Sequence, residues 1–203
     1  KKLDEEPDIN TVMLVHSETT SGLINPLKEI AGIAKAAGKT VLVDTMSSFA
    51  AYETDLKAFG IDALASSANK CLEGLPGLAF VVATKKLLEG ESSSKSLCFD
   101  LCDQYRYLYP DGKFRFTSPT TVMLALRRAL DLYKLEGGLE ARKARYQANH
   151  DALTEGMRRL GITSIVPEKW QSYIITTFDL GDISFANMYA RLKADGFVIY
   201  PGK

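Results

Sequence analysis

Residues 25–44 decide the fold, and they read NPLKEIAGIAKAAGKTVLVD. The first half predicts a helix, because Asn25 can cap its first turn and Pro26 fits the first helical position, where a missing N–H costs nothing. Apolar side chains then recur at helical spacing and form one stripe: Leu27, Ile30, Ala31 and Ala34. Gly38 ends this helix, and the unbroken apolar run at 40–43 is typical of a buried strand.

The same alternation of strand and helix continues through the first 83 residues. Apolar runs predict strands at 11–16, from 63 to near Asn69, and at 78–83, and residues 55–59 predict a short helix that stops at Gly60. Buried strands that alternate with amphipathic helices indicate an α/β fold, in which a mainly parallel sheet is flanked by helices.

The character of the sequence changes after residue 84. The expected elements are a polar loop at 91–96, a long helix opened by Thr117 and ending near Gly137, a charged helix at 139–160, strands near 162–166 and 173–178, a helix capped by Ser184, and a strand at 197–200. The charged helix suits a solvent-exposed connector between domains. We therefore expect residues 1–137 to be part of a large domain, and residues 138–203 to be a connecting helix with the incomplete start of a small α+β domain.

The composition narrows the classes of function. The 203 residues carry 25 Lys and Arg against 25 Asp and Glu, so a nucleic-acid or anionic-membrane partner is not expected. No run of about 18 apolar residues is present, and the N-terminus lacks the apolar core of a signal peptide. Three cysteines do not resemble a disulfide framework, so a cytoplasmic protein is expected. Two distant histidines, and the pair Cys98 and Cys102, are too few ligands to predict a metal site.

Polar residues follow three of the predicted strands. Glu18, Thr19 and Thr20 follow the first, Asp44 follows the second, and the segment from Ser67 to Lys70 follows the third. Parallel strands bring such loops to one edge of the sheet, where ligands bind. A lysine, a carboxylate and a hydroxyl together suit pyridoxal 5'-phosphate (PLP), which needs a Schiff-base lysine and an acidic partner for its pyridine nitrogen. Taken alone, Lys70 could also be a solvated surface lysine, and Asp44 could be a helix cap or a turn residue. The segment that starts at Thr19 could be an ordinary turn.

Three stretches of the sequence resemble the class V group of fold-type I aminotransferases, which are PLP enzymes. They are HSETTSG at 16–22, VDTMSS at 43–48 and SSANKC at 66–71. The most specific part is the segment around Lys70 with the turn GLPG at 74–77 four residues later. The resemblance runs over nearly the whole chain, and it implies the PLP-binding large domain of that fold.

The resemblance also implies a role for six residues. Lys70 would be the Schiff-base lysine and would shuttle the proton between the substrate and the cofactor. The implied cofactor-binding residues are Asp44 at the pyridinium nitrogen, Thr19 near the ring hydroxyl, Met46 on one ring face, Asn69 beside the lysine, and Thr117 at the cofactor phosphate of the neighbouring subunit. A homodimer is implied, because relatives build each site from both subunits.

Residues 114–120 and 196–203 are similar to a branch of the family that transfers the amino group of 2-aminoethylphosphonate to pyruvate. This implies phosphonoacetaldehyde and alanine as products, within phosphonate degradation. Phe114 departs from this pattern, because many relatives have a larger aromatic residue there. Relatives also place a phosphate-binding loop before the region matching residue 1 and a substrate-binding arginine after the region matching residue 203. We therefore expect the chain to be the middle of a longer enzyme.

Other functions stay open at this stage. One is a sibling aminotransferase that acts on alanine, serine or phosphoserine with another keto acid. A second is a PLP-dependent lyase such as a cysteine desulfurase, for which Cys98 and Cys102 are the candidate nucleophiles, although nothing near them lowers a thiol pKa. A third is a non-catalytic module that kept only the dimer surface of an enzyme.

Overall fold

The computed structural model describes residues 1–202, so the last residue of the predicted second domain lies outside the described part. The elements are α1 (Lys2–Glu5), β1 (Thr11–Val15), α2 (Leu27–Ala36), β2 (Thr40–Asp44), α3 (Leu56–Phe59), β3 (Ala63–Ser67), β4 (Ala79–Ala83), α4 (Lys85–Leu88), α5 (Leu101–Asp111), α6 (Thr120–Glu136), α7 (Gly138–Arg159), β5 (Thr163–Ser164), the 3-10 helix η1 (Glu168–Trp170), β6 (Phe178–Asp179) and α8 (Phe185–Ala194).

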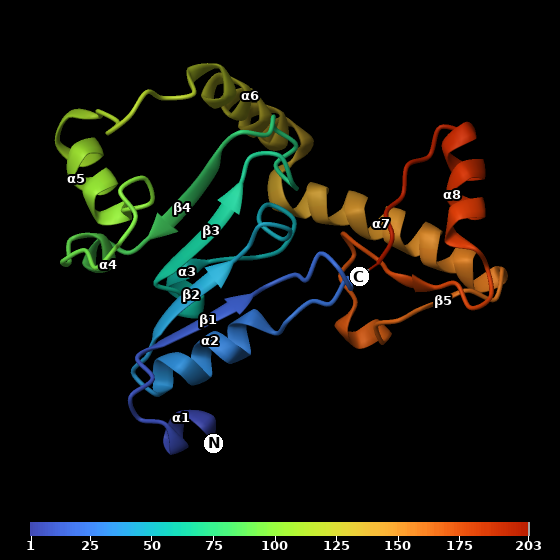
Figure 1. The fold of residues 1–203 in the computed structure, drawn as a ribbon, viewed down its shortest axis with the longest axis horizontal. Helices are drawn as coiled ribbons and strands as arrows, with labels where there is room; N and C mark the ends of the chain where they lie inside the picture. Colours follow the sequence, from blue (N-terminus) through green and yellow to red (C-terminus); the bar gives the residue numbers. More distant parts are fainter. Residues whose placement is uncertain (203) are drawn as a thin grey trace.

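Four strands form the central sheet in the order β1-β2-β3-β4 (Figure 1). The pairs β1–β2 and β2–β3 are parallel, and β4 runs antiparallel to β3. The predicted mainly parallel α/β sheet is therefore confirmed. A second sheet of two antiparallel strands, β5 and β6, lies near the far end of α7.

The core lies between α2, α3 and one face of this sheet. The predicted apolar stripe of α2 is buried at Leu27, Ala31 and Ala34, and it packs against Val41 and Val43 of β2. Full burial of a side chain as large as valine or leucine contributes about 1.5–3 kcal/mol, so this layer fixes the position of β2 beneath the helix.

The start of α2 differs from the prediction. The N-cap residue is Pro26, and no side chain caps the helix. The side-chain Nδ2 of Asn25 instead donates a hydrogen bond of 2.8 Å to the carbonyl of Val15, at the end of β1. The predicted capping role of Asn25 is wrong because the open end of the neighbouring strand takes its side chain. The short helix α3 does start and stop as predicted, with Asp55 accepting from the N–H of Ala58 and with a left-handed Gly60.

The second half agrees with the prediction in its long helices and differs in its strands. Helices α6 and α7 lie within about three residues of their expected bounds, and they meet at Gly137. The predicted strand 173–178 shrinks to β6, and residues 197–200 form no strand. Helices α1, α4 and α5 were not predicted. The division of the chain at residues 137 and 138 stays a prediction.

None of the helices in residues 1–202 combines the length and the apolar character that are needed to cross a membrane.

Candidate active site

The carboxyl ends of β1, β2 and β3 lie at one edge of the sheet (Figure 1). The register pairs Val15 with Asp44 and Asp44 with Ala65, so the loops that follow the three strands start side by side. Thr19 lies in the first loop, Asp44 is the last residue of β2, and Lys70 lies in the turn after β3. The structure therefore brings these three candidate residues to the same edge.

Ser47 connects the three loops. Its hydroxyl lies 2.7 Å from the hydroxyl of Thr19, in the loop after β1. Its carbonyl accepts a hydrogen bond from the thiol of Cys71, with 3.5 Å between sulfur and oxygen. Because Cys71 directly follows Lys70, Ser47 links the loop after β2 to both neighbouring loops and helps to fix their positions.

Asp44 is half-buried, and its carboxylate is oriented by the local backbone. The N–H of Met46 donates a hydrogen bond of 2.8 Å to its Oδ1. Its carbonyl accepts from the N–H of His16 at 2.8 Å, which extends the pairing of β1 and β2 by one residue. A carboxylate can accept up to about four hydrogen bonds, so this one keeps capacity for a protonated ring nitrogen. Met46 is also half-buried and follows Asp44 closely.

The turn that carries Lys70 is tightly closed by its own backbone. The N–H of Glu73 donates to the carbonyl of Lys70, and the N–H of Gly74 donates to the carbonyl of Ala68, each at 2.8 Å. A Cβ at Gly74 would lie only 2.8 Å from that carbonyl oxygen, so the closure needs glycine. The side chains of Asn69 and Lys70 are exposed, on a turn whose backbone is held.

Buried hydroxyls join the ends of β2 and β3 beneath the site. Thr45 is fully buried, and both its N–H and its hydroxyl donate to the carbonyl of Ala65 at 2.9 Å. The hydroxyl of Ser66 donates to the carbonyl of Thr45 at 3.3 Å. These bonds satisfy backbone groups just where the strand pairing ends, and they keep the two loops together.

Three aromatic rings pack together beside the loop after β2. The rings of Tyr52 and Tyr173 stack with centroids 4.1 Å apart, and the hydroxyl of Tyr173 donates to the carbonyl of Ala51. His16 meets the ring of Tyr52 edge-on at 5.5 Å. Burial lowers the pKa of His16 to about 4, so its imidazole is neutral at physiological pH. Neutral His16 therefore acts as a packing group and not as a charge in the site.

The cysteines do not form a nucleophile at this edge. Burial raises the pKa of the Cys71 thiol to about 11, so it stays protonated and can donate to Ser47. Cys98 and Cys102 lie before and within α5. Because β4 runs antiparallel, α4 and α5 lie at the opposite edge of the sheet from Lys70 (Figure 1).

Thr117 is not brought to the group around Ser47. It is exposed, and it lies in the segment between α5 and α6. Its expected role at the cofactor phosphate of a neighbouring subunit stays a prediction.

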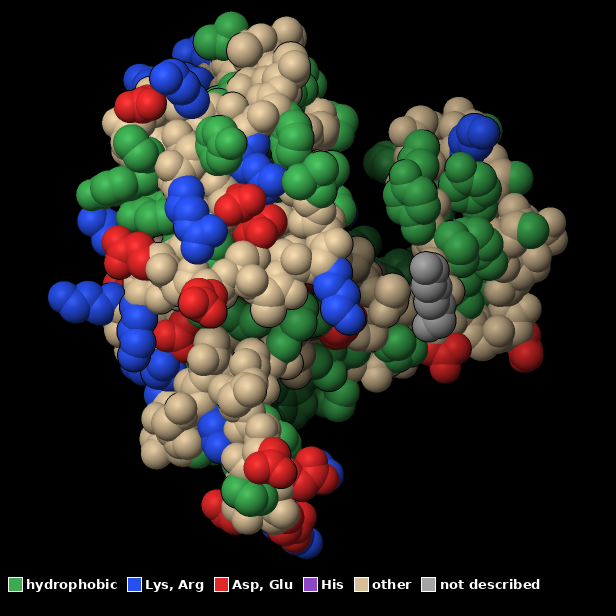
Figure 2. Space-filling model, turned by 60° about the vertical axis from the view of Figure 1, so that its left-hand side comes forward, with side chains coloured by type: hydrophobic (Ala, Val, Ile, Leu, Met, Phe, Trp, Pro, Cys, Tyr) green, Lys and Arg blue, Asp and Glu red, His purple; other side chains and the backbone are tan. Residues whose placement is uncertain are grey.

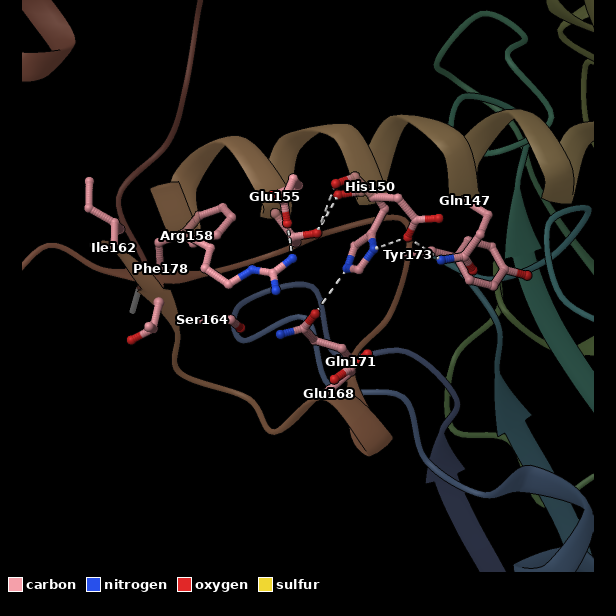
Figure 3. A pocket seen from close by; sticks show the side chains of 13 residues that line it. Gln147, His150, Glu155, Arg158, Ile162, Ser164, Glu168, Gln171, Tyr173 and Phe178 are labelled. Carbon is pink, nitrogen blue, oxygen red and sulfur yellow. Dashed lines mark hydrogen bonds and ion pairs between the residues drawn. The ribbon is translucent and has the colours of Figure 1, made fainter. Parts of the chain in front are cut away.

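A cavity of about 660 Å³ lies elsewhere, between α7 and the segment with β5 and β6 (Figure 3). None of the six candidate residues lines it. His150 projects from α7 toward Gln171, with 3.0 Å between Nε2 and Oε1. The walls of this cavity carry charges of both signs. Cavity volume therefore does not identify the edge of the sheet where the lysine, the carboxylate and the hydroxyl lie.

Sequence reasoning assigned no role to Ser47, although the residue lies within the stretch VDTMSS that carries part of the resemblance. Its link to Thr19 spans 28 residues and its link to Cys71 spans 24, so neither follows from local spacing. Tyr52 and Tyr173 were missed for the same reason, because their rings come from segments 121 residues apart.

The sequence profile of the family described as Aminotransferase class-V matches residues 1–203. The chain belongs to the class-V aminotransferase family. Among its relatives are two proteins named 2-aminoethylphosphonate--pyruvate transaminase. The one from Vibrio cholerae is 48% identical over 206 residues, which cover 99% of this chain and 56% of the relative. The one from Phocaeicola vulgatus is 48% identical over 205 residues, which cover 99% and 57%.

The solved structure of another aminotransferase has the same fold. Pyridoxamine-pyruvate aminotransferase from Mesorhizobium loti superimposes with a TM-score of 0.87 at 27% identity, covering 100% of this chain and 53% of that one. The chain thus spans a little over half the length of the relatives that it matches. The fold is that of PLP-dependent class-V aminotransferases.

The family implies PLP as the cofactor, and the residues at the sheet edge fit it. An exposed lysine amine, a half-buried carboxylate and a hydroxyl lie on three adjacent loops, which is the donor set that PLP requires. Ser47 links the loops of Lys70 and Thr19 through its hydroxyl and its carbonyl. The assignment of these residues to the cofactor stays a prediction.

Proposed function

We propose that this chain is part of a PLP-dependent transaminase that moves the amino group of 2-aminoethylphosphonate to pyruvate. The products are phosphonoacetaldehyde and alanine, and the reaction opens phosphonate degradation. The observation that carries the proposal is the joining of the Lys70, Asp44 and Thr19 loops through Ser47. The substrates are supported by relatives of that name that are 48% identical to this chain over 99% of its length.

Lys70 is the proposed catalytic residue. Bound PLP supplies an electron sink for the α-carbon of the substrate. The Lys70 amine would hold the cofactor covalently, and it would carry a proton to and from that carbon. Backbone hydrogen bonds close the turn and hold the main chain of Lys70 in place. The flexible four-carbon side chain still lets the amine move.

The other five residues are proposed to bind the cofactor. Asp44 keeps the ring nitrogen protonated, and the hydroxyl of Thr19 bonds near the ring oxygen. Met46 packs on a ring face, and Asn69 binds beside the lysine. Thr117 reaches the phosphate of the cofactor in the partner subunit. These roles are consistent with three loops at one edge and with an exposed Thr117 on a separate segment.

The test uses the complete natural polypeptide that contains this chain, loaded with PLP. We expect alanine to form from pyruvate with 2-aminoethylphosphonate as the donor, in ping-pong kinetics, and to be lost in Lys70→Ala. Faster turnover with alanine or serine as the donor and glyoxylate as the acceptor would show that the protein is a sibling aminotransferase. Sulfur release from cysteine would indicate a lyase, and a protein that takes up no PLP would be the non-catalytic module.

We also propose a homodimer in the cytoplasm. Large apolar side chains are exposed along α5 and α6, including Leu101, Tyr109, Leu124 and Leu135. Figure 2 views the molecule from the α5 side and shows apolar side chains among the charged ones on this face. A partner subunit seated there would bury them and would receive Thr117. The three free cysteines suit a reducing compartment.

A further inference from the structure

Arg142, in the first turns of α7, is a charged residue without access to solvent. Its side chain is only 2% exposed. A buried guanidinium is costly unless its donors are paired, and here they are. It donates to the carbonyl of Cys71, the residue after Lys70, and its Nε donates to Oε2 of Glu136 at 2.7 Å. One of its terminal nitrogens also lies 3.6 Å from Oε2 of Glu73.

Two arginines and two glutamates form a closed network around this point. Arg145 donates from Nε to Glu136 and from its terminal nitrogen to Glu73, each at 2.7 Å. The hydroxyl of Tyr146 donates to the same oxygen of Glu73 at 3.1 Å. Hydrogen bonds from Arg145 and then Arg142 lower the pKa of Glu136 to about 2, so this carboxylate stays ionised. The network therefore persists over the whole physiological pH range.

The network holds the Lys70 turn in a conformation that its sequence disfavours. Glu73 has φ of +58°, in the left-handed region that glycine adopts easily and glutamate does not. Its N–H closes the turn on the carbonyl of Lys70. Three donors from α7, on Arg142, Arg145 and Tyr146, fix the side chain of Glu73 from behind. Only Arg142 also binds the backbone of the turn.

We propose that Arg142 is the positioning residue for Lys70, and that through it the junction of α6 and α7 sets where the lysine amine points. This inference rests on the proposed function, because it gives Lys70 a chemical role. Arg142 makes no hydrogen bond or ion pair with any of the six candidate residues. It acts through the carbonyl of Cys71 and the side chain of Glu73 on one side, and through Glu136 at the end of α6 on the other.

The test compares Arg142→Lys and Arg142→Met with Arg145→Met in the complete protein. Arg145 is the matched control, because it bonds the same two glutamates, is 43% exposed and makes no bond to the Cys71 carbonyl. In the PLP-bound protein, both Arg142 variants should keep the cofactor on Lys70. Their kcat should fall about ten- to a hundredfold while KM for pyruvate changes little, since a misplaced group costs rate more than binding.

A purely structural role for Arg142 would not change the electronic state of the cofactor. We therefore expect the pH midpoint of the visible absorption band to move by about half a unit in both Arg142 variants and to stay in Arg145→Met. If Arg142→Met does not fold, Arg142→Lys carries the test. Losses of activity that follow the losses of stability in all three variants, with an unmoved midpoint, would overturn the proposal.

A measurement on cofactor-free protein separates this inference from the proposed function. Amide hydrogen exchange at Glu73 and Gly74, which close the turn, should be faster in Arg142→Lys than in the unsubstituted protein, and the increase should be larger than in Arg145→Met, which keeps the bond to the Cys71 carbonyl. Equal exchange in all three proteins would show that Arg142 does not hold the turn. If PLP does not attach to the unsubstituted protein, the proposed function fails, and the exchange rates still decide whether Arg142 fixes the turn.

Discussion

Asp44 combines a fixed position with unused hydrogen-bonding capacity. Its Oδ1 accepts from the N–H of Met46, so Asp44→Asn can keep that bond and the loop shape while it loses the charge. We expect amino transfer to fall about ten- to a hundredfold, the effect of about 1.5–3 kcal/mol for a hydrogen bond to a charged group. The free energy of unfolding should change by less than about 1 kcal/mol. Equal losses in stability and activity would contradict a role at the cofactor ring.

His16 should make stability sensitive to mild acid. Burial lowers its pKa from 6.5 to about 4, so below pH 6.5 the unfolded chain takes up a proton that the folded chain refuses. The free energy of unfolding is therefore unaffected by His16 well above pH 6.5. As the pH falls from 6.5 to about 4, it decreases by about 1.4 kcal/mol per pH unit. Between pH 7 and pH 5, urea unfolding should show a loss of about 2 kcal/mol that is absent in His16→Asn. An identical loss in the variant would place the sensitivity elsewhere.

At the scale of elements, the loop after β1 is built to receive the segment after η1. Gly22 has φ of +77°, and a Cβ there would lie 2.3 Å from the carbonyl oxygen of Ile175. Its carbonyl also accepts from the N–H of Ser172 at 2.7 Å. Gly22→Ala should therefore cost backbone strain and a backbone clash together, about 3–5 kcal/mol of unfolding free energy.

Gly38→Ala is the matched control for that substitution. Gly38 has φ of +71°, and nothing lies within 4 Å of a Cβ built there. This variant should cost only the strain of a left-handed residue, about 1–2 kcal/mol. Equal costs at Gly22 and Gly38, measured by denaturant unfolding, would show that the two segments are not in contact.

The elements that the sequence predicted correctly are those with a local cause. The stripe of α2, the strand at 40–44 and the helix ends at Gly60 and Gly137 all follow from spacing and backbone preference. The predicted strand at 173–178 failed because Tyr173 stacks on Tyr52, and the N–H of Ser172 pairs with the loop after β1 instead of with a strand. Such a choice depends on a partner 120 or more residues away, which no local pattern contains.

The candidate site divides in the same way. Thr19, Asp44 and Lys70 could be found from the sequence, because each follows a predicted strand and parallel strands end at one edge. Ser47 and Arg142 could not, because their partners are set by the packing of loops and of α7. Residues that position other residues, such as Ser47 and Arg142, are thus harder to predict from the sequence than the candidate residues themselves.

At the scale of the whole molecule, the neutral chain has no charge repulsion that would oppose self-association. Leu124, on α6, is 72% exposed and lies on the surface proposed for the partner subunit. Leu124→Glu should therefore weaken the dimer of the complete protein by at least about tenfold in sedimentation equilibrium, because a charge would be buried without a partner. Leu160, 73% exposed at the end of α7, is the control, and Leu160→Glu should leave the dimer intact. Equal effects of both substitutions would move the interface.

Lys70 is the residue that we propose holds PLP. The complete protein is incubated with PLP, reduced with borohydride and digested, and the peptide that carries the added phosphopyridoxyl mass is identified by mass spectrometry. The mass should lie on Lys70 and disappear in Lys70→Arg, with no other lysine labelled to a comparable extent. Labelling of another lysine, or undiminished labelling of the Lys70→Arg protein, would show that Lys70 does not hold PLP.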